Sequence, residues 1–150
     1  MNRRALLSGA GLLLPALAAA QGSRVFRVGV LVPGQPEPFW TIFRDTLKEL
    51  GYVEGANIRF EFRSAEFQIA RLDALAAELV ELKVDAIVAV QTPSALAAKK
   101  ATRAIPVVLA GVGDAVATGL VTSLARPEAN LTGVSTATAE LAGKSVELLK

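Results

Sequence analysis

The sequence of 150 residues contains no histidine and no cysteine, and only 5% of it is aromatic. The two absences exclude Ser-His-Asp and Cys-His nucleophile systems, disulfides, and zinc sites built on nitrogen or sulfur ligands. Carboxylates, lysines and hydroxyls remain, and each would need a strongly shifted pKa to act as a catalyst near neutral pH. We therefore expect a binding protein without a metal or other cofactor, and not an enzyme.

Neither sign of charge dominates the chain. Lysine and arginine number 16 against 14 for aspartate and glutamate, and the first twenty residues hold Arg3 and Arg4 but no acidic residue. The chain without these twenty residues is nearly neutral and therefore poorly suited to bind a phosphate backbone, so we expect no nucleic-acid partner. The 52% of hydrophobic residues is too high for a disordered chain and predicts one domain with a buried core.

Residues 1–20 have the layout of a signal peptide. Arg3 and Arg4 precede an apolar run over residues 5–17, and three alanines stand before Gln21. The run is shorter than the roughly 20 residues that a membrane-spanning helix needs, and its glycines and proline disfavour the alternative of an uncleaved anchor. We expect cleavage before Gln21 and export to the periplasm, by either the general secretory or the twin-arginine route.

Strand and helix patterns alternate along the rest of the chain. Apolar or alternating runs predict strands at residues 27–32, 57–63, 86–90, 105–109 and 131–135. Apolar stripes at helical spacing predict helices at residues 39–50, 68–82, 95–102 and 115–124. Short connections and right-handed crossovers then give an α/β fold, a doubly wound open parallel sheet with helices on both faces.

A ligand crevice is expected outside the carboxyl ends of the strands, where the winding reverses. With the common strand order 2-1-3-4-5, this place lies between the first and third strands, and residues 33–40 and 91–94 line it. The fourth strand, next to them, is followed by Asp114. The predicted ligand-binding residues are Gln35, Trp40, Gln91, Thr92, Ser94 and Asp114.

Each of these residues also has a structural interpretation. Hydroxyls at a helix start suit a carboxylate ligand, but Thr92 could simply cap the helix. Trp40 lies off the apolar stripe of Phe39, Phe43, Leu47 and Leu50, so its indole either stacks on a ligand or covers the edge of the domain. Asp114 either pairs with an ammonium group or caps the helix that follows. The residues alone leave these alternatives open.

Nucleotide-binding motifs are missing. Gly111 and Gly113 lack the third glycine of a dinucleotide fingerprint, and there is no Walker-type phosphate loop. A signalling receiver module would need carboxylates at the ends of the first and third strands, which residues 33–35 and 91–92 do not supply. A small-molecule enzyme on the same sheet is the other alternative to a binding protein.

A series of short segments occurs in order along residues 28–150. They are GVL at 29–31, LGYVEGANI at 50–58, RL at 71–72, AAELV at 76–80, TP at 92–93, IPVV at 105–108, GDAVATGLV at 113–121 and NLTG at 130–133. In these segments the chain resembles the periplasmic substrate-binding proteins of ABC transporters, in the branch that includes tryptophan and tyrosine binders. It departs from that family at Ala115, where a proline commonly follows Gly-Asp.

The resemblance implies a type I periplasmic-binding fold, in which two α/β lobes close over a small ligand. Residues 25–135 would form the first lobe, and residues 136–150 the crossover and first helix of a second lobe whose remainder is not in the sequence. The other interpretation of that helix is that it docks back on the first lobe. The implied partners are a small organic solute, such as an amino acid, and an inner-membrane ABC permease that receives it from a monomeric binding protein.

Overall fold

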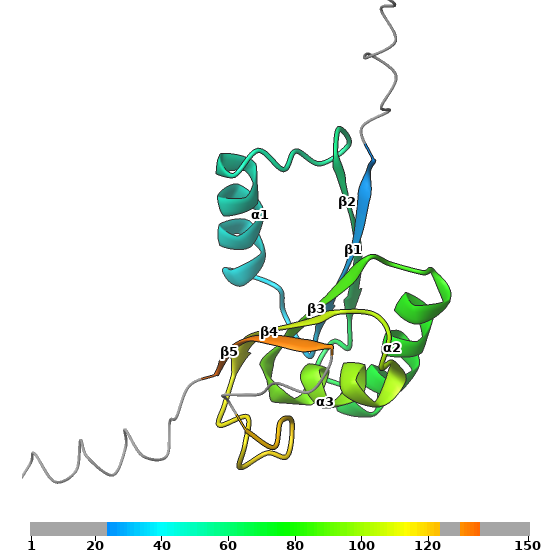
Figure 1. Ribbon diagram of the computed structural model, residues 1–150, viewed down its shortest axis with the longest axis vertical. Helices are drawn as coiled ribbons and strands as arrows, with labels where there is room; N and C mark the ends of the chain where they lie inside the picture. Colours follow the sequence, from blue (N-terminus) through cyan, green and yellow to red (C-terminus); the bar gives the residue numbers. More distant parts are fainter. Residues whose placement is uncertain (1–23, 124–129, 136–150) are drawn as a thin grey trace, which may run out of the picture.

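The computed structural model describes residues 24–123 and 130–135, and five parallel strands form one sheet in the order β2-β1-β3-β4-β5 (Figure 1). The elements are β1 (Phe26–Val32), α1 (Phe39–Glu49), β2 (Ile58–Ser64), a 3-10 turn (Ile69–Arg71), α2 (Leu72–Glu81), β3 (Ala86–Val90), α3 (Gln91–Ala101), β4 (Val107–Val112) and β5 (Leu131–Ser135). The predicted α/β fold and strand order are confirmed. The expected signal peptide and the expected crossover and helix at 136–150 lie outside the described residues.

The pairing of the strands follows from their sequence patterns. β1 and β3 lie inside the sheet and are almost continuously apolar, because both of their faces are covered. β2 is an edge strand, and its residues alternate between apolar and charged side chains. β1 and β2 pair in register over seven residues, from Phe26 opposite Ile58 to Val32 opposite Ser64.

One face of the sheet is closed by α2 and α3, which lie on the side opposite α1 in Figure 1. Leu79 of α2 is fully buried, and its side chain packs against β1 at Gly29, where a methyl group would approach it to about 3.0 Å. The alanines of α3 allow that helix to lie close to β3 and β4. This side holds the larger core, and no described helix is long and apolar enough to cross a membrane.

The other face is covered by α1 alone among the described helices. No residue of α1 is fully buried, and its aromatic side chains rest on β2 and on the valines of β1 and β3. Trp40 belongs to this packing, with its indole 5.0 Å from the ring of Phe60 and 5.4 Å from that of Phe62. Of the two interpretations of Trp40, the structure agrees with the structural one, in which the indole covers the edge of the domain. Trp40 also packs against Phe43 of the predicted stripe, whereas Leu50 at the end of that stripe is exposed.

Several boundaries differ from those predicted. α3 begins at Gln91 rather than at residue 95, and β4 covers Val107–Val112 rather than residues 105–109. A 3-10 turn precedes α2, where a continuous helix was predicted from residue 68. The predicted helix at 115–124 is wrong over its described residues 115–123: residues 115–119 form hydrogen-bonded turns, and residues 120–123 are not helical. Gly119 ends these turns in a left-handed conformation with φ of 72°, which stops helical propagation.

Gly133 allows β5 to lie close to β4. A Cβ atom there would lie 2.3 Å from the carbonyl oxygen of Leu109, and its φ of 138° lies outside the range usual for other residues. The β4–β5 register shifts between Leu109 and Val112, next to this glycine. The shift moves the end of β5 beside the loop that follows β4.

Candidate functional site

A crevice lies at the carboxyl edge of the sheet, between the ends of β1 and β3. Its volume is about 330 Å³, and it opens where the winding of the sheet reverses. The loop of residues 33–38 forms one wall, and the start of α3 forms the facing wall. The side chains of Phe67 and Ile69, which follow β2, line the crevice from the side of the edge strand.

The strand β3 passes directly into α3 at this crevice. Gln91 makes the turn in a left-handed conformation with φ of 64°, so strand and helix are joined without an intervening loop. In the described part of the chain no side chain caps the start of α3, and its first turn contains no acidic residue. A helix N-terminus carries unpaired N–H groups and a partial positive charge, so this one is suited to an anionic group such as a carboxylate.

Two hydroxyl groups fix the neighbouring loop at residues 113–115. The Thr92 hydroxyl accepts a hydrogen bond from the N–H of Gly113 at 3.2 Å. The Ser135 hydroxyl donates to the carbonyl oxygen of Gly113 and accepts from the N–H of Ala115, both at 2.9 Å. The ends of β4 and β5 are thereby tied to the start of α3, which holds the loops of the carboxyl edge in one arrangement.

Ser94 and Asp114 differ in how their polar atoms are satisfied. Ser94 is fully buried in the first turn of α3, and among the described residues its hydroxyl has no hydrogen-bond partner. A carboxylate oxygen of Asp114 accepts hydrogen bonds from the N–H groups of Val116 and Ala117, both at 3.0 Å. Asp114 therefore caps the turn that follows it, whereas the Ser94 hydroxyl is a buried polar group with unused bonding capacity.

Comparison with known proteins identifies the family of the chain. A model of the family described as ABC transporter substrate binding protein matches residues 40–150. The chain belongs to this family. Membership agrees with the position of the crevice, because ligands of open α/β sheets bind at the carboxyl edge where the winding reverses.

Other substrate-binding proteins resemble the chain over part of their length. A curated "Tyrosine-binding protein" from Clostridioides difficile (strain R20291) is 40% identical over 93 residues, which are 62% of this chain and 27% of that protein. The ligand-free, open structure of a substrate binding protein with adhesive properties from Clostridium difficile has a TM-score of 0.70 at 33% identity, covering 74% of this chain and 39% of that one.

Two further solved structures share the fold. An ABC domain in complex with L-Trp from Streptococcus pneumonia gives a TM-score of 0.67 at 29% identity, covering 74% of this chain and 38% of that one. A conserved domain protein from Vibrio cholerae gives a TM-score of 0.72 at 31% identity, and the match covers 83% of this chain and 43% of that one. The chain thus spans less than half the length of the substrate-binding proteins that it matches.

The six predicted ligand-binding residues occupy three kinds of position in this family member. Gln35 and Gln91 line the crevice, as predicted for them. Thr92 and Asp114 make structural hydrogen bonds near the crevice. Asp114 caps the turn that follows it, which is one of its two predicted roles. The Thr92 hydroxyl bonds to Gly113 instead of capping its own helix. Trp40 packs on β2 and Ser94 is buried in α3, and neither is among the residues that line the crevice.

Sequence reasoning missed three residues at this edge of the substrate-binding domain. Phe67 and Ile69 line the crevice, although they follow an edge strand and carry no motif. Ser135 ends the last described strand, and its role depends on the register shift between β4 and β5. Ile69 was instead predicted to lie on the apolar stripe of a helix at 68–82, and the one signal for Phe67 was its apolar character directly before that helix.

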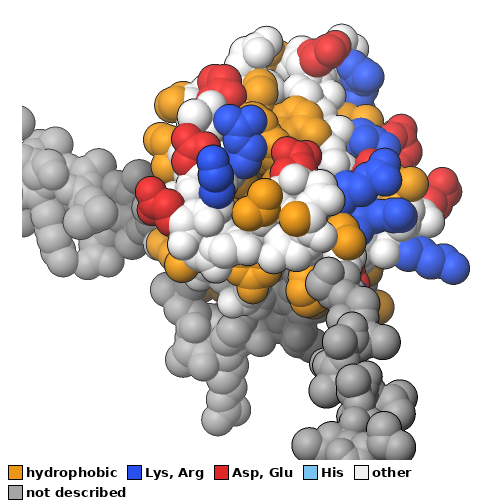
Figure 2. Space-filling view, turned by 90° about the horizontal axis from the view of Figure 1, so that it is seen from above, with side chains coloured by type: hydrophobic (Ala, Val, Ile, Leu, Met, Phe, Trp, Pro, Cys, Tyr) orange, Lys and Arg blue, Asp and Glu red, His pale blue; other side chains and the backbone are white. Residues whose placement is uncertain are grey.

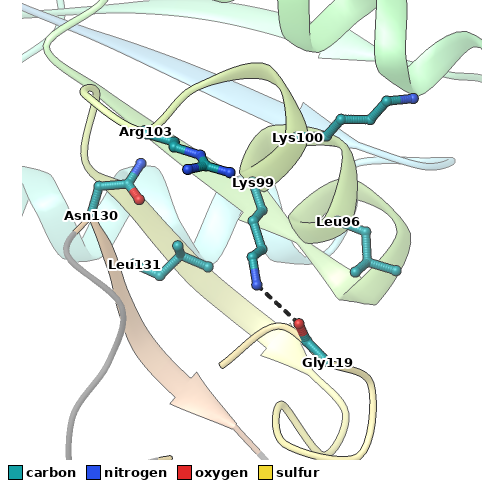
Figure 3. A pocket seen from close by; sticks show the side chains of 7 residues that line it. All are labelled: Leu96, Lys99, Lys100, Arg103, Gly119, Asn130 and Leu131. Carbon is teal, nitrogen blue, oxygen red and sulfur yellow. Dashed lines mark hydrogen bonds between the residues drawn. The ribbon is translucent and has the colours of Figure 1, made fainter. Parts of the chain in front are cut away.

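A second hollow lies between the later part of α3 and the start of β5, as Figure 3 shows. Lys99, Lys100 and Arg103 give it a basic rim, but two of these cations already contact protein groups. The Lys99 ammonium donates to the carbonyl oxygens of Gly119 and Leu120 at 3.0 Å, and Lys100 pairs with Asp73 while pointing away from Lys99. These contacts give Lys99 and Lys100 a role in stabilising the fold.

Charged side chains elsewhere are mixed in sign. Figure 2 shows acidic and basic groups next to one another around apolar atoms on one face of the molecule. At the amino end of β3, the backbone N–H of Arg27 donates to Asp85 at 2.8 Å and lowers the pKa of its carboxyl; desolvation opposes this shift, and the adjacent Arg24 guanidinium adds to it. Within residues 24–123 and 130–135 no cluster of three potential acidic metal ligands occurs.

Proposed function

We propose that the protein is the solute-binding component of an ABC importer and that it binds an amino acid at the carboxyl-edge crevice. It would deliver this solute to an inner-membrane permease without altering it chemically. Residues 1–20 would direct export to the periplasm. Residues 25–135 would form the first lobe of a monomeric two-lobed protein, and residues 136–150 would lead into the second lobe.

The observation that carries this proposal is the uncapped start of α3 at the wall of the crevice. An α-carboxylate placed there would accept hydrogen bonds from the N–H groups of the first turn. The amides of Gln35 and Gln91 line the same cavity and can both donate and accept hydrogen bonds. The crevice therefore offers complementary groups to the polar end of an amino acid.

The hydroxyl groups around α3 have separate roles in this proposal. The hydroxyls of Thr92 and Ser135 hold the loop after β4 through their hydrogen bonds to Gly113. The Ser94 hydroxyl, buried in the first turn of α3 and without a described partner, would be available to hydrogen-bond a solute carboxylate at the start of that helix. The carboxylate of Asp114, which accepts a hydrogen bond from the N–H of Val116, would also pair with the ammonium group of the solute.

The relatives support the choice of an amino acid as solute. One is named a tyrosine-binding protein, and one solved structure holds L-Trp. Because the chain matches less than half of those proteins, the remaining contacts to the solute would come from a second lobe that closes over the first. The 330 Å³ of the open crevice is then one side of a larger enclosed site.

Isothermal titration calorimetry of the full-length, two-lobed protein with L-tyrosine and L-tryptophan tests this proposal. The matched ligands are L-tyrosinamide and L-tryptophanamide, which keep the ring and the ammonium group but lose the negative charge. We expect the amides to bind at least about 10-fold more weakly, since a charge-assisted contact to a helix N-terminus is lost. Equal affinities for acid and amide would contradict the carboxylate position, and chemical conversion of the solute would contradict a transport role.

A further inference from the structure

The turn after β2 holds an aromatic side chain in an unfavourable position at the crevice. Glu66 and Phe67 are consecutive residues with left-handed backbone conformations, at φ of 51° and 66°. Residues with a side chain rarely adopt this conformation, and for a bulky residue it is an outlier. The Phe67 side chain is also 70% exposed, so burial of the ring does not offset the backbone cost.

Hydrogen bonds to the end of β1 hold this turn in place. The N–H of Phe67 donates to the carbonyl oxygen of Pro33 at 2.8 Å, and the Ser64 hydroxyl donates to that of Gly34 at 2.8 Å. The N–H of Ala65 donates to Val32 at 3.0 Å. The turn is thus attached to the loop that forms the opposite side of the crevice entrance.

Gly34 makes room for the ring of Phe67. A Cβ atom at Gly34 would lie 2.3 Å from Cε1 of Phe67 and 2.7 Å from two further ring carbons. The ring therefore lies directly over the backbone of the β1 loop and lines the crevice, together with Ile69, which is 52% exposed. Phe67 and Ile69 thus give the crevice an apolar lining, whereas Gln35, Glu37 and Gln91 give it a polar one.

We propose that Phe67 is a specificity-determining residue whose ring contacts the apolar side chain of the solute and favours an aromatic one. This inference rests on the proposed function and adds the residue that selects among amino acids. Strained backbone conformations are found mainly at functional sites, where the loss of stability is tolerated because the residue has a role in function. Aromatic rings stack on one another by offset or edge-to-face contact, so an aromatic solute gains more from Phe67 than an aliphatic one does.

The test is calorimetric titration of the full-length protein, three variants at Phe67 and one control variant with L-tryptophan, L-tyrosine and L-leucine. For Phe67→Leu, which keeps an apolar side chain but removes the ring, we expect the Kd of the aromatic amino acids to rise about 5- to 10-fold. The Kd of leucine should change less than about 2-fold. Phe67→Tyr, which retains the ring, should keep the affinity for aromatic solutes within about 3-fold of the unsubstituted chain.

Phe67→Gly separates a binding role from a structural one. Glycine adopts the left-handed conformation without strain, so this variant should melt at a temperature equal to or higher than that of the unsubstituted chain. It should nevertheless lose aromatic affinity by about 10-fold or more. A lower melting temperature with unchanged affinity would show that Phe67 acts only in folding and would overturn the proposal.

Phe26 provides the matched control, because it is an aromatic residue at the opposite end of β1 and is 41% exposed. Phe26→Leu should leave every Kd unchanged. If the unsubstituted chain binds the aromatic amino acids but Phe67→Leu binds them equally well, the role of Phe67 is wrong and the proposed function stands. If the unsubstituted full-length, two-lobed protein binds none of the three amino acids, the proposed function and the role of Phe67 are both wrong.

Discussion

The two faces of the sheet differ in how completely helices cover them. On one face α2 and α3 bury leucines, isoleucine and alanines against the strands, and Leu79 and Ile87 are fully inaccessible. On the other face α1 has no fully buried residue, and it rests on a small cluster of valines and half-buried aromatic rings. Val134 of β5 is 72% exposed, whereas Leu131 of the same strand is buried in the larger core.

The two faces therefore contribute unequally to stability, and the proposed binding site lies on neither of them but at the carboxyl edge of the sheet. Burial of apolar area is the main favourable term in folding, so the α2–α3 face contributes most of it. The carboxyl edge depends instead on hydrogen bonds between loops, such as those from Thr92 and Ser135 to Gly113. We therefore expect substitutions on the two faces to change stability by different amounts.

Leu79→Ala should have the largest effect on this comparison. It empties a site that is fully buried between α2 and β1, and such substitutions cost about 2–5 kcal/mol in the free energy of unfolding. Urea denaturation followed by circular dichroism measures this loss. A cost below about 1 kcal/mol would mean that the α2–α3 face is not the stabilising core.

Phe43→Ala makes the corresponding change on the α1 face. Phe43 packs on Phe39 at 5.4 Å and on Phe60 at 6.1 Å between ring centroids, but it is only half-buried. We expect a loss of about 1–2 kcal/mol in the same urea experiment, because part of the side chain already contacts water. A loss as large as that of Leu79→Ala would remove the distinction between the two faces.

Asp85→Asn tests the amino edge of the sheet and its dependence on pH. The pKa of Asp85 is lowered in the folded state, so the ion pair with Arg24 and the hydrogen bond from Arg27 add stability above the unfolded pKa near 4. This stability is lost as the pH falls through the lower, folded pKa. In thermal melts at pH 7, the free energy of unfolding of the variant should be lower by less than about 1 kcal/mol. At a pH below the folded pKa of Asp85, the variant and the unsubstituted chain should be equally stable.

Val134→Ala should have the smallest effect, within about 0.5 kcal/mol, because the side chain is mostly exposed. Leu131→Ala is the matched control in the same strand, and it should cost about 2 kcal/mol or more. The pair compares the two faces of β5 directly. Similar losses from both substitutions would indicate that further contacts bury Val134 in solution.

The sheet could be predicted because its signals are local. The stripe that forms α2 has the helical period, and the apolar runs that form β1 and β3 are short and rich in β-branched residues, which favours strands. Short connections then restrict the strand order. The crevice follows from that order alone, which is why Gln35 and Gln91 were placed at it from the sequence.

The remaining features depend on contacts between distant segments. The orientation of Trp40 is set by Phe60 and Phe62 of the edge strand, and that pairing is not visible in the helical stripe. The hydroxyl of Thr92 bonds to Gly113 because Gln91 adopts a left-handed conformation that its residue type does not indicate. Phe67 was missed for the same reason, since its position at the crevice depends on the turn that it forms with Glu66.

The account depends most on the claim that the carboxyl edge of the sheet is the solute site. Amide chemical shifts of the ¹⁵N-labelled chain, recorded while L-tryptophan is added, test this claim directly. We predict that the shifts change for residues 34–37, 67–69 and 91–95, around the crevice between β1 and β3. Changes confined to α3 beyond Lys99 and to the start of β5, or no changes at any concentration, would contradict it.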